Sequence, residues 1–140
     1  FDMVRFYLGN DEIKEIFATA SNISSKKFND IKDYELATCV LKSKTGVICT
    51  INNSRHYKYG YDQRIEVFGS KGCLISENKK KYNFFIDRYK TAYKLQLQDL
   101  VNLANKNKKP RASFIDGEKA LLLANAAYKS LSSKKVIKIR

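Results

Sequence analysis

With 140 residues, of which 44% are apolar, the chain is long and apolar enough to bury a core of its own, which excludes a disordered polypeptide. No apolar run approaches the roughly 20 residues that a membrane-spanning helix needs, so the sequence predicts no membrane partner. The formal net charge is +13, but residues 1–70 hold 10 basic and 9 acidic residues, while residues 71–140 hold 17 and 5. Because the excess lies in turn-like and terminal segments, it indicates solvated loops and no nucleic-acid partner. A non-catalytic basic module that binds nucleic acid or an acidic partner is the alternative.

The three cysteines, Cys39, Cys49 and Cys73, are odd in number and show no Cys-x-x-Cys spacing. This pattern favours buried free thiols in a reducing, cytoplasmic compartment over disulfides. With His56 as the only histidine, the sequence also offers too few ligands for a zinc site. The chain begins with Phe1 rather than Met, and we expect it to be a fragment of a longer polypeptide.

The first elements follow from the spacing of apolar side chains. Residues 1–9 place them at helical intervals before a glycine, which predicts the last two turns of a helix. Residues 12–21 alternate between two faces, with Ile13 expected on one face and Ile16 on the other, which predicts a strand. The polar stretch 22–32 predicts a loop.

Two hairpins are predicted next. The apolar runs 34–41 and 47–53 flank a turn in which Gly46 can take a positive φ. Both faces of these runs are rather apolar, so we expect the second face to be covered by helices or by another subunit. Residues 63–78 repeat the design, with a Gly-Ser-Lys-Gly turn between two strands.

Residues 85–106 predict a long amphipathic helix. Its apolar stripe, expected to face a core, consists of Ile86, Tyr89, Tyr93, Leu97, Leu100 and Ala104. A second helix, capped by Asp116 and opened by Gly117, is apolar almost all round and is expected to be well buried. Residues 135–139 predict a closing strand. This order predicts an α+β fold: a largely antiparallel mixed sheet with helices packed on one face and the other face open for oligomerisation.

Complete catalytic motifs are missing from the sequence. The glycines of "FGSKG" lie in a hairpin, not between a strand and a helix, so they do not form a dinucleotide-binding loop. Neither a phosphate-binding P-loop nor a Gly-x-Ser-x-Gly motif occurs. The richest chemistry lies in residues 57–64, "YKYGYDQR", which hold three tyrosines, an aspartate and an arginine. On its own residues the chain therefore lacks a complete catalytic set and looks like half of something larger.

Four motifs carry a resemblance to a known family. They are "FDMVRFYLG" (1–9), "INNSRHYKYGYDQRIEVFGSKGCL" (51–74), "DRYKTAY" (87–93) and "DGEKALLLANAAYKSL" (116–131). In this order they are similar to the C-terminal domain of the Gfo/Idh/MocA oxidoreductases and, among these, to the inositol 2-dehydrogenases. The resemblance covers nearly the whole chain.

The resemblance implies an N-terminal Rossmann domain that binds NAD or NADP and carries the catalytic lysine. It also implies an Asp-x-x-x-His motif whose histidine, which moves the hydroxyl proton, would stand one or two residues before Phe1. Hydride transfer needs these groups, because a positioned base takes the alcohol proton while the hydride goes to nicotinamide. We therefore expect residues 1–140 to be a C-terminal substrate-binding and oligomerisation domain of a homo-oligomer, with no catalytic or cofactor-binding residue and no metal site.

For this chain the resemblance implies the substrate side of the site, with a cyclic polyol or sugar such as myo-inositol as the substrate. Asp2 matches a position whose carboxylate accepts hydrogen bonds from hydroxyls, and a water-exposed helix residue is the simpler interpretation. Tyr59 matches the tyrosine that reaches toward the inositol ring, and Tyr61 is the alternative one register away. Asn53 and Arg55 are further candidates at the same mouth.

The loop 57–64 itself is predicted to make a sharp bend. Asp62 and Arg64 are expected to hold this bend by hydrogen bonds or an ion pair, and Gly60 is expected to permit it. The loop would thereby leave the sheet and present an aromatic hydroxyl to a sugar-like ligand at a domain interface.

Overall fold

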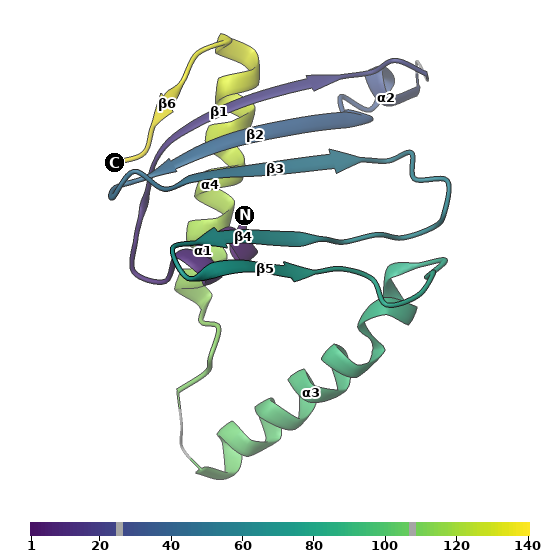
Figure 1. The fold of residues 1–140 in the computed structure, drawn as a ribbon, viewed down its shortest axis with the longest axis vertical. Coiled ribbons are helices and arrows are strands. Elements are labelled where there is room, and N and C mark those ends of the chain that lie inside the picture. Colours follow the sequence, from purple (N-terminus) through teal and green to yellow (C-terminus); the bar gives the residue numbers. More distant parts are fainter. Residues whose placement is uncertain (25–26, 107–108) are drawn as a thin grey trace. The chain divides into compact units, whose positions relative to one another are not determined.

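The computed structural model describes residues 1–24, 27–106 and 109–140. The elements in chain order are α1 (Asp2–Leu8), β1 (Ile13–Ser21), α2 (Lys27–Asp30), β2 (Leu36–Ser43), β3 (Ile48–Ser54), β4 (Ile65–Gly69), β5 (Gly72–Ser76), α3 (Phe85–Lys106), α4 (Phe114–Ser133) and β6 (Ile137–Lys138), as Figure 1 shows. They fall into two compact units: unit 1 comprises Phe1–Arg55 and Ala112–Arg140, and unit 2 comprises His56–Arg111. The predicted α+β class is confirmed, and nearly every predicted helix and strand is present.

Unit 1 contains a four-stranded sheet in the order β3-β2-β1-β6. The hairpin between β2 and β3 forms as predicted, and Gly46 takes a φ of 95°, a value that residues with a Cβ rarely adopt. Every strand pair in the described residues is antiparallel, including β4 with β5, which form a separate two-stranded sheet. The prediction of a largely antiparallel sheet is confirmed, and no parallel pair that would make the sheet mixed occurs among the described residues.

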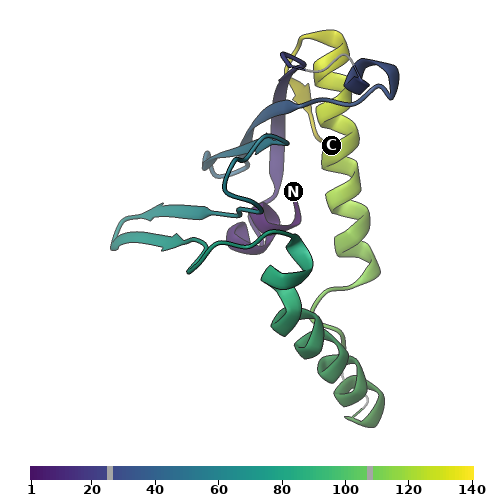
Figure 2. The same ribbon diagram turned by 90° about the vertical axis from the view of Figure 1, so that its right-hand side faces the viewer.

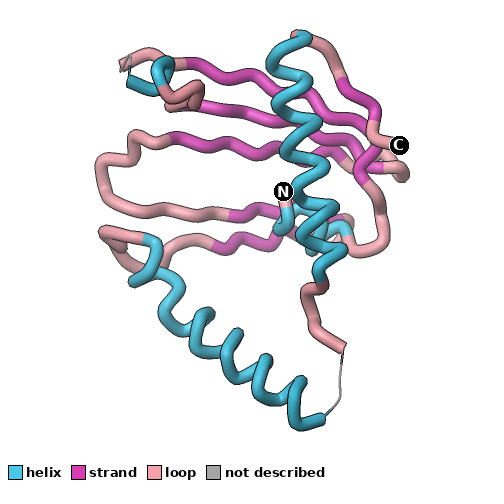
Figure 3. The backbone as a smooth tube through the Cα atoms, turned by 180° about the vertical axis from the view of Figure 1, so that it is seen from behind, coloured by secondary structure: helices cyan, strands magenta, loops and turns pink. Residues whose placement is uncertain are grey.

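Helix α4 covers one face of the four-stranded sheet, as Figures 2 and 3 show for unit 1. The core between them consists of Ile13, Ile16, Ala18, Cys39, Leu41, Leu123, Ala126 and Ala127. Ile13 and Ile16 were predicted on opposite faces, and this was wrong. The register of β1 against β2 shifts between Ile13 and Glu15, and this bulge returns Ile13 to the buried face.

The N-terminus of α4 differs from the prediction. The helix begins at Phe114, and Ser113 is its N-cap, so Asp116 is not the capping residue. Asp116 instead closes a capping box from the third helical position, where its carboxylate accepts a hydrogen bond from the Ser113 backbone N–H at 2.8 Å. Only one side of α4 is buried: Leu121 is 61% exposed, whereas Leu123 is 4% exposed. The prediction that the whole helix is buried was therefore wrong within this chain.

Apolar side chains are exposed on the face of the four-stranded sheet opposite α4. Phe17 of β1, Val40 of β2 and Ile48 of β3 are exposed there. Threonine and asparagine side chains alternate with them, and Thr38 hydrogen-bonds Asn52 across the strands at 3.0 Å. This face is half apolar and half polar, which suits an interface better than a core.

Unit 2 contains the β4–β5 hairpin and α3, and none of its described residues is buried. The predicted core stripe of α3 is exposed: Leu97 is 65% and Leu100 is 62% accessible. The helix itself forms as predicted, but the expectation that its stripe meets a core was wrong for this chain. All three thiols are free as predicted, and Cys39 is buried and Cys49 half-buried. The prediction of burial was wrong for Cys73 in β5, which is exposed for the same reason as the stripe of α3.

Two smaller findings concern the rest of the described chain. The stretch 22–32, predicted to be a loop, includes the single-turn helix α2. Within residues 1–24, 27–106 and 109–140, no helix is long and apolar enough to cross a membrane.

Candidate functional site

Asp2 lies in the first turn of α1, where a carboxylate is favoured by the partial positive charge of the helix N-terminus. Its side chain is 64% exposed, and its Oδ1 accepts a hydrogen bond from Arg5 Nη1 at 3.1 Å. Arg5 is one helical turn further on, so the spacing of three residues brings the two groups together. Asp2 is thus an exposed carboxylate with one oxygen held in place.

Asn53 lies near the end of β3 in unit 1, and Arg55 directly follows this strand. Asn53 is opposite Ala37 in the β2–β3 register and is exposed, so its amide is accessible to a ligand. Arg55 is occupied by the chain itself: its Nε donates to the Tyr34 carbonyl at 3.1 Å, and its Nη2 pairs with the Asp33 carboxylate. The structure therefore gives Arg55 a role in holding the segment before β2.

The loop 57–64 belongs to unit 2, and its bend depends on Gly60. Gly60 has a φ of 101°, and a Cβ at this position would lie 2.1 Å from the Tyr82 carbonyl oxygen. The same carbonyl accepts a hydrogen bond from the Tyr61 backbone N–H at 2.6 Å. Only glycine fits this close approach, so the prediction that Gly60 permits a sharp path is supported by its geometry.

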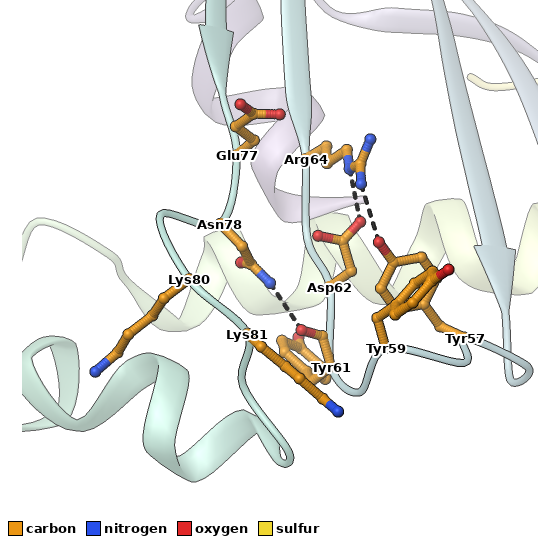
Figure 4. A pocket seen from close by; sticks show the side chains of 9 residues that line it. All are labelled: Tyr57, Tyr59, Tyr61, Asp62, Arg64, Glu77, Asn78, Lys80 and Lys81. Carbon is orange, nitrogen blue, oxygen red and sulfur yellow. Dashed lines mark hydrogen bonds and ion pairs between the residues drawn. The ribbon is translucent and has the colours of Figure 1, made fainter.

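A polar clamp holds the two ends of the loop. Arg64 donates from Nε to Asp62 Oδ2 at 2.7 Å and from Nη2 to the Tyr57 hydroxyl at 3.0 Å, as Figure 4 shows. The hydrogen bond that Arg64 donates to Asp62 raises the pKa of the Arg64 guanidinium, so the clamp stays charged. Asp62 and Arg64 therefore hold the bend as predicted, and Tyr57 is a third member that was not predicted.

Tyr59 and Tyr61 have different surroundings. The ring of Tyr61 is half-buried and packs against Tyr89 at 5.9 Å and Phe85 at 6.3 Å between centroids. Burial raises the pKa of the neighbouring Tyr89 to about 12, which indicates an apolar setting. The side chain of Tyr59 is 63% exposed and meets only the edge of Tyr57 at 5.9 Å among the aromatic rings of the described chain. Tyr61 has the environment of a packing residue, and Tyr59 that of a contact residue.

These residues line a pocket of about 210 Å³ that lies wholly within unit 2. Its walls are formed by Tyr57, Tyr59, Tyr61, Asp62, Arg64, Glu77, Asn78, Lys80 and Lys81, which Figure 4 shows. Aromatic faces beside amide, carboxylate and ammonium groups suit a small ligand that carries several hydroxyls. Sequence reasoning missed Asn78, Lys80 and Lys81, because the polar turn after β5 carries no spacing signal that pairs it with the loop 57–64.

The candidate residues are divided between the two units, with Asp2, Asn53 and Arg55 in unit 1 and Tyr59 and Tyr61 in unit 2. Among the described residues, no group of three or more His, Cys, Asp or Glu side chains is arranged to hold a metal ion. The chemistry available on these side chains is hydrogen bonding and ring stacking.

The fold and these residues can be compared with known proteins. The family description "GFO/IDH/MocA C-terminal domain" matches residues 1–75. The myo-inositol 2-dehydrogenase of Thermotoga maritima is 36% identical over 99% of this chain and 46% of its own length. The inositol 2-dehydrogenase of Rhizobium meliloti is likewise 36% identical, over 99% of this chain and 47% of its own length. The crystal structure of a myo-inositol dehydrogenase from Corynebacterium glutamicum superposes with a TM-score of 0.93 at 33% identity, covering 99% of this chain and 46% of that one.

The chain therefore belongs to the Gfo/Idh/MocA family and corresponds to the C-terminal domain of its members. It spans about half the length of the relatives that it matches. The resemblance found in the sequence motifs is confirmed by the family match.

Proposed function

We propose that residues 1–140 form the substrate-binding and oligomerisation half of an NAD- or NADP-dependent oxidoreductase that acts on a cyclic polyol or sugar such as myo-inositol. The match of residues 1–75 to the family's C-terminal domain carries this proposal, and the names of the two relatives at 36% identity supply the substrate class. The cofactor and the catalytic lysine, aspartate and histidine belong to the other half of such an enzyme. The free cysteines are compatible with a reducing, cytoplasmic compartment.

On the substrate side, we assign Tyr59 rather than Tyr61 to the polyol, because Tyr59 is exposed at the pocket and Tyr61 is packed against Tyr89. Asp2 supplies a charged acceptor, and charge-assisted hydrogen bonds to hydroxyls are stronger than neutral ones. Asn53 is an accessible amide with a lesser role, and Arg55 acts by holding the chain near it.

The oligomer interface is the open face of the four-stranded sheet. Phe17, Val40 and Ile48 are exposed there and would be buried against a second copy. Sedimentation equilibrium at moderate salt is expected to show species larger than 16.1 kDa at higher concentration. A monomer across the whole range would contradict this interface.

A basic module that binds nucleic acid or an acidic partner is the alternative, and the exposed rings of Tyr57, Tyr59 and Phe68 are a feature that such a module would share. The family match supports the dehydrogenase. Calorimetry with NAD is expected to give no micromolar binding to this chain alone, because residues 1–140 contain no Gly-rich strand–turn–helix segment. In the full-length protein, we expect the Asp-x-x-x-His motif before Phe1, with its histidine directly followed by an aspartate.

Tyr59→Phe in the full-length enzyme tests the site. The change removes one hydroxyl and leaves the ring, so a lost substrate hydrogen bond should cost ~0.5–1.5 kcal/mol, or about two- to tenfold in kcat/KM. Tyr61→Phe is the matched control and should change kcat/KM less. Unchanged kinetics for Tyr59→Phe beside a large loss for Tyr61→Phe would defeat the assignment, and unchanged kinetics for both would remove the loop from the site.

A further inference from the structure

Arg5 donates three hydrogen bonds from its guanidinium, to two different residues. Its Nη1 donates to Asp2 Oδ1 at 3.1 Å and to the Asp116 backbone carbonyl at 2.9 Å, and its Nη2 donates to Asp116 Oδ1 at 2.9 Å. The guanidinium thus joins α1 to the first turn of α4, across 111 residues of sequence. The Arg5 side chain is only 19% exposed, so it is held along its length as well as at its tip.

The partner of Arg5 on α4 is itself fixed. The second carboxylate oxygen of Asp116, Oδ2, accepts from the Ser113 backbone N–H at 2.8 Å and from the Ser113 hydroxyl at 2.7 Å. These hydrogen bonds, together with the guanidinium of Arg5, hold the pKa of Asp116 well below its usual range. Both oxygens of Asp116 are therefore committed, and the carboxylate has little freedom to turn.

Asp2 stands at the other end of this chain of contacts. Within the described chain the Oδ1 atom of Asp2 accepts a hydrogen bond from Arg5, and the Asp2 side chain is 64% exposed. Its Oδ2 atom can therefore accept a hydrogen bond from a ligand hydroxyl. An exposed ion pair three residues apart on a helix adds little stability. Its physical effect is to restrict the rotamer of Asp2, and a ligand then loses less free energy in ordering this side chain.

We propose that Arg5 is a positioning residue, which orients the Asp2 carboxylate toward a substrate hydroxyl and is itself held by the N-terminal turn of α4. The inference rests on the proposed function, since it needs Asp2 to contact the polyol. It adds a residue that never touches the substrate, and it links the site to the capping box of Ser113 and Asp116. Loosening the capping box should therefore weaken substrate binding only through its effect on the orientation of Asp2.

A double-mutant cycle in the full-length enzyme tests this inference. Arg5→Met should raise KM for the polyol about tenfold with a smaller change in kcat, because a charged hydrogen bond is misplaced while the reacting atoms are untouched. In an Asp2→Asn background the same change should raise KM by less than about twofold. Arg5→Lys should recover part of the loss. Arg111→Met is the matched control, because Arg111 is an exposed arginine paired with Asp99 at 3.5 Å, and it should leave KM unchanged.

The outcomes separate the two proposals. If Asp2→Asn raises KM but Arg5→Met does not, Arg5 only docks α1 on α4 and the inference is overturned. The same conclusion follows if the KM of the double variant rises by the full product of the two single fold-changes. If Asp2→Asn has no effect, the proposed role of Asp2 fails, and the role of Arg5 fails with it. If Arg5→Met does not fold, Asp116→Asn, which loosens the far end of the same chain of contacts, should raise KM in the wild-type background and not in the Asp2→Asn background. Equal KM changes in both backgrounds would overturn the inference there too.

Discussion

Unit 1 and unit 2 each combine an antiparallel sheet with a long helix, yet among the described residues only unit 1 buries side chains. Its core includes Ile16 and Leu41, both 0% exposed. In unit 2 no described residue is buried, and Leu97 of α3 is 65% exposed and Phe68 of β4 is 79% exposed. Apolar periodicity specifies which face of an element favours burial, but a partner surface has to be present for that burial to occur.

The two units are also specified by different interactions. In unit 1, Ala126 and Ala127 allow α4 to approach the sheet, and the buried Ser130 hydroxyl accepts from the Ala18 N–H at 3.0 Å. In unit 2, backbone geometry at Gly60 and the clamp around Arg64 define the loop. Unit 1 is therefore held by the packing of a closed core, and unit 2 by backbone fit, polar contacts and contacts between half-buried aromatic rings.

The largest expected effect is in amide hydrogen exchange of this chain. The amides of β1, β2 and α4 should exchange on the order of a thousandfold more slowly than those of α3 and the β4–β5 hairpin, because opening unit 2 exposes no core. Exchange resolved by NMR or mass spectrometry checks this. Equal protection in both units would break the comparison.

A matched pair of leucine truncations compares the two units directly. Leu41→Ala should lower the free energy of unfolding by about 2–5 kcal/mol, because it leaves a cavity in a closed core. Leu97→Ala removes the same atoms from an exposed helix face and should change it by less than about 0.5 kcal/mol. Urea denaturation of the two variants measures both values, and a large loss for Leu97→Ala would show that α3 is buried in solution.

Two glycine variants test whether unit 2 depends on backbone fit. Both Gly60 and Gly46 have positive φ, but a Cβ at Gly60 meets the Tyr82 carbonyl, whereas one at Gly46 meets nothing within 4 Å. Gly46→Ala should cost about 1 kcal/mol from φ alone, and Gly60→Ala should cost more and shift the amide resonances of Tyr59 and Tyr61. Equal losses in the free energy of unfolding for the two variants would contradict the close contact at Gly60.

The smallest expected effect concerns acid stability in unit 1. The pKa of Asp116 is lower in the folded chain than in the unfolded chain, so its ionised form stabilises the fold fully above about pH 4, and this contribution is lost progressively as the pH falls from there through the folded-state pKa, which lies well below the usual range. Asp116→Asn should therefore lower Tm by a few degrees at pH 7 and by less at pH 3. Thermal melts at the two pH values check the sign, and an equal deficit at both would rule out the charge as the cause.

Much of the fold follows from the sequence, because the signals are local. The apolar runs 34–41 and 47–53 predicted two strands, and Gly46 predicted the turn between them. The clamp of Asp62 with Arg64 was also predictable, since the two residues are two positions apart and carry opposite charges. In each case the interacting groups lie within a few residues, where chain geometry alone restricts their partners.

The tertiary structure decided what depends on distant partners. The bulge after Ile13 arises from pairing with β2, and the exposure of Leu97 reflects the absence of a packed surface in unit 2. The bond from Arg5 to Asp116 joins residues 111 positions apart, and no spacing rule links them. Periodicity and turn chemistry act over a few residues and were readable from the sequence, whereas burial and the orientation of the Asp2 carboxylate depend on which surfaces the folded chain brings together.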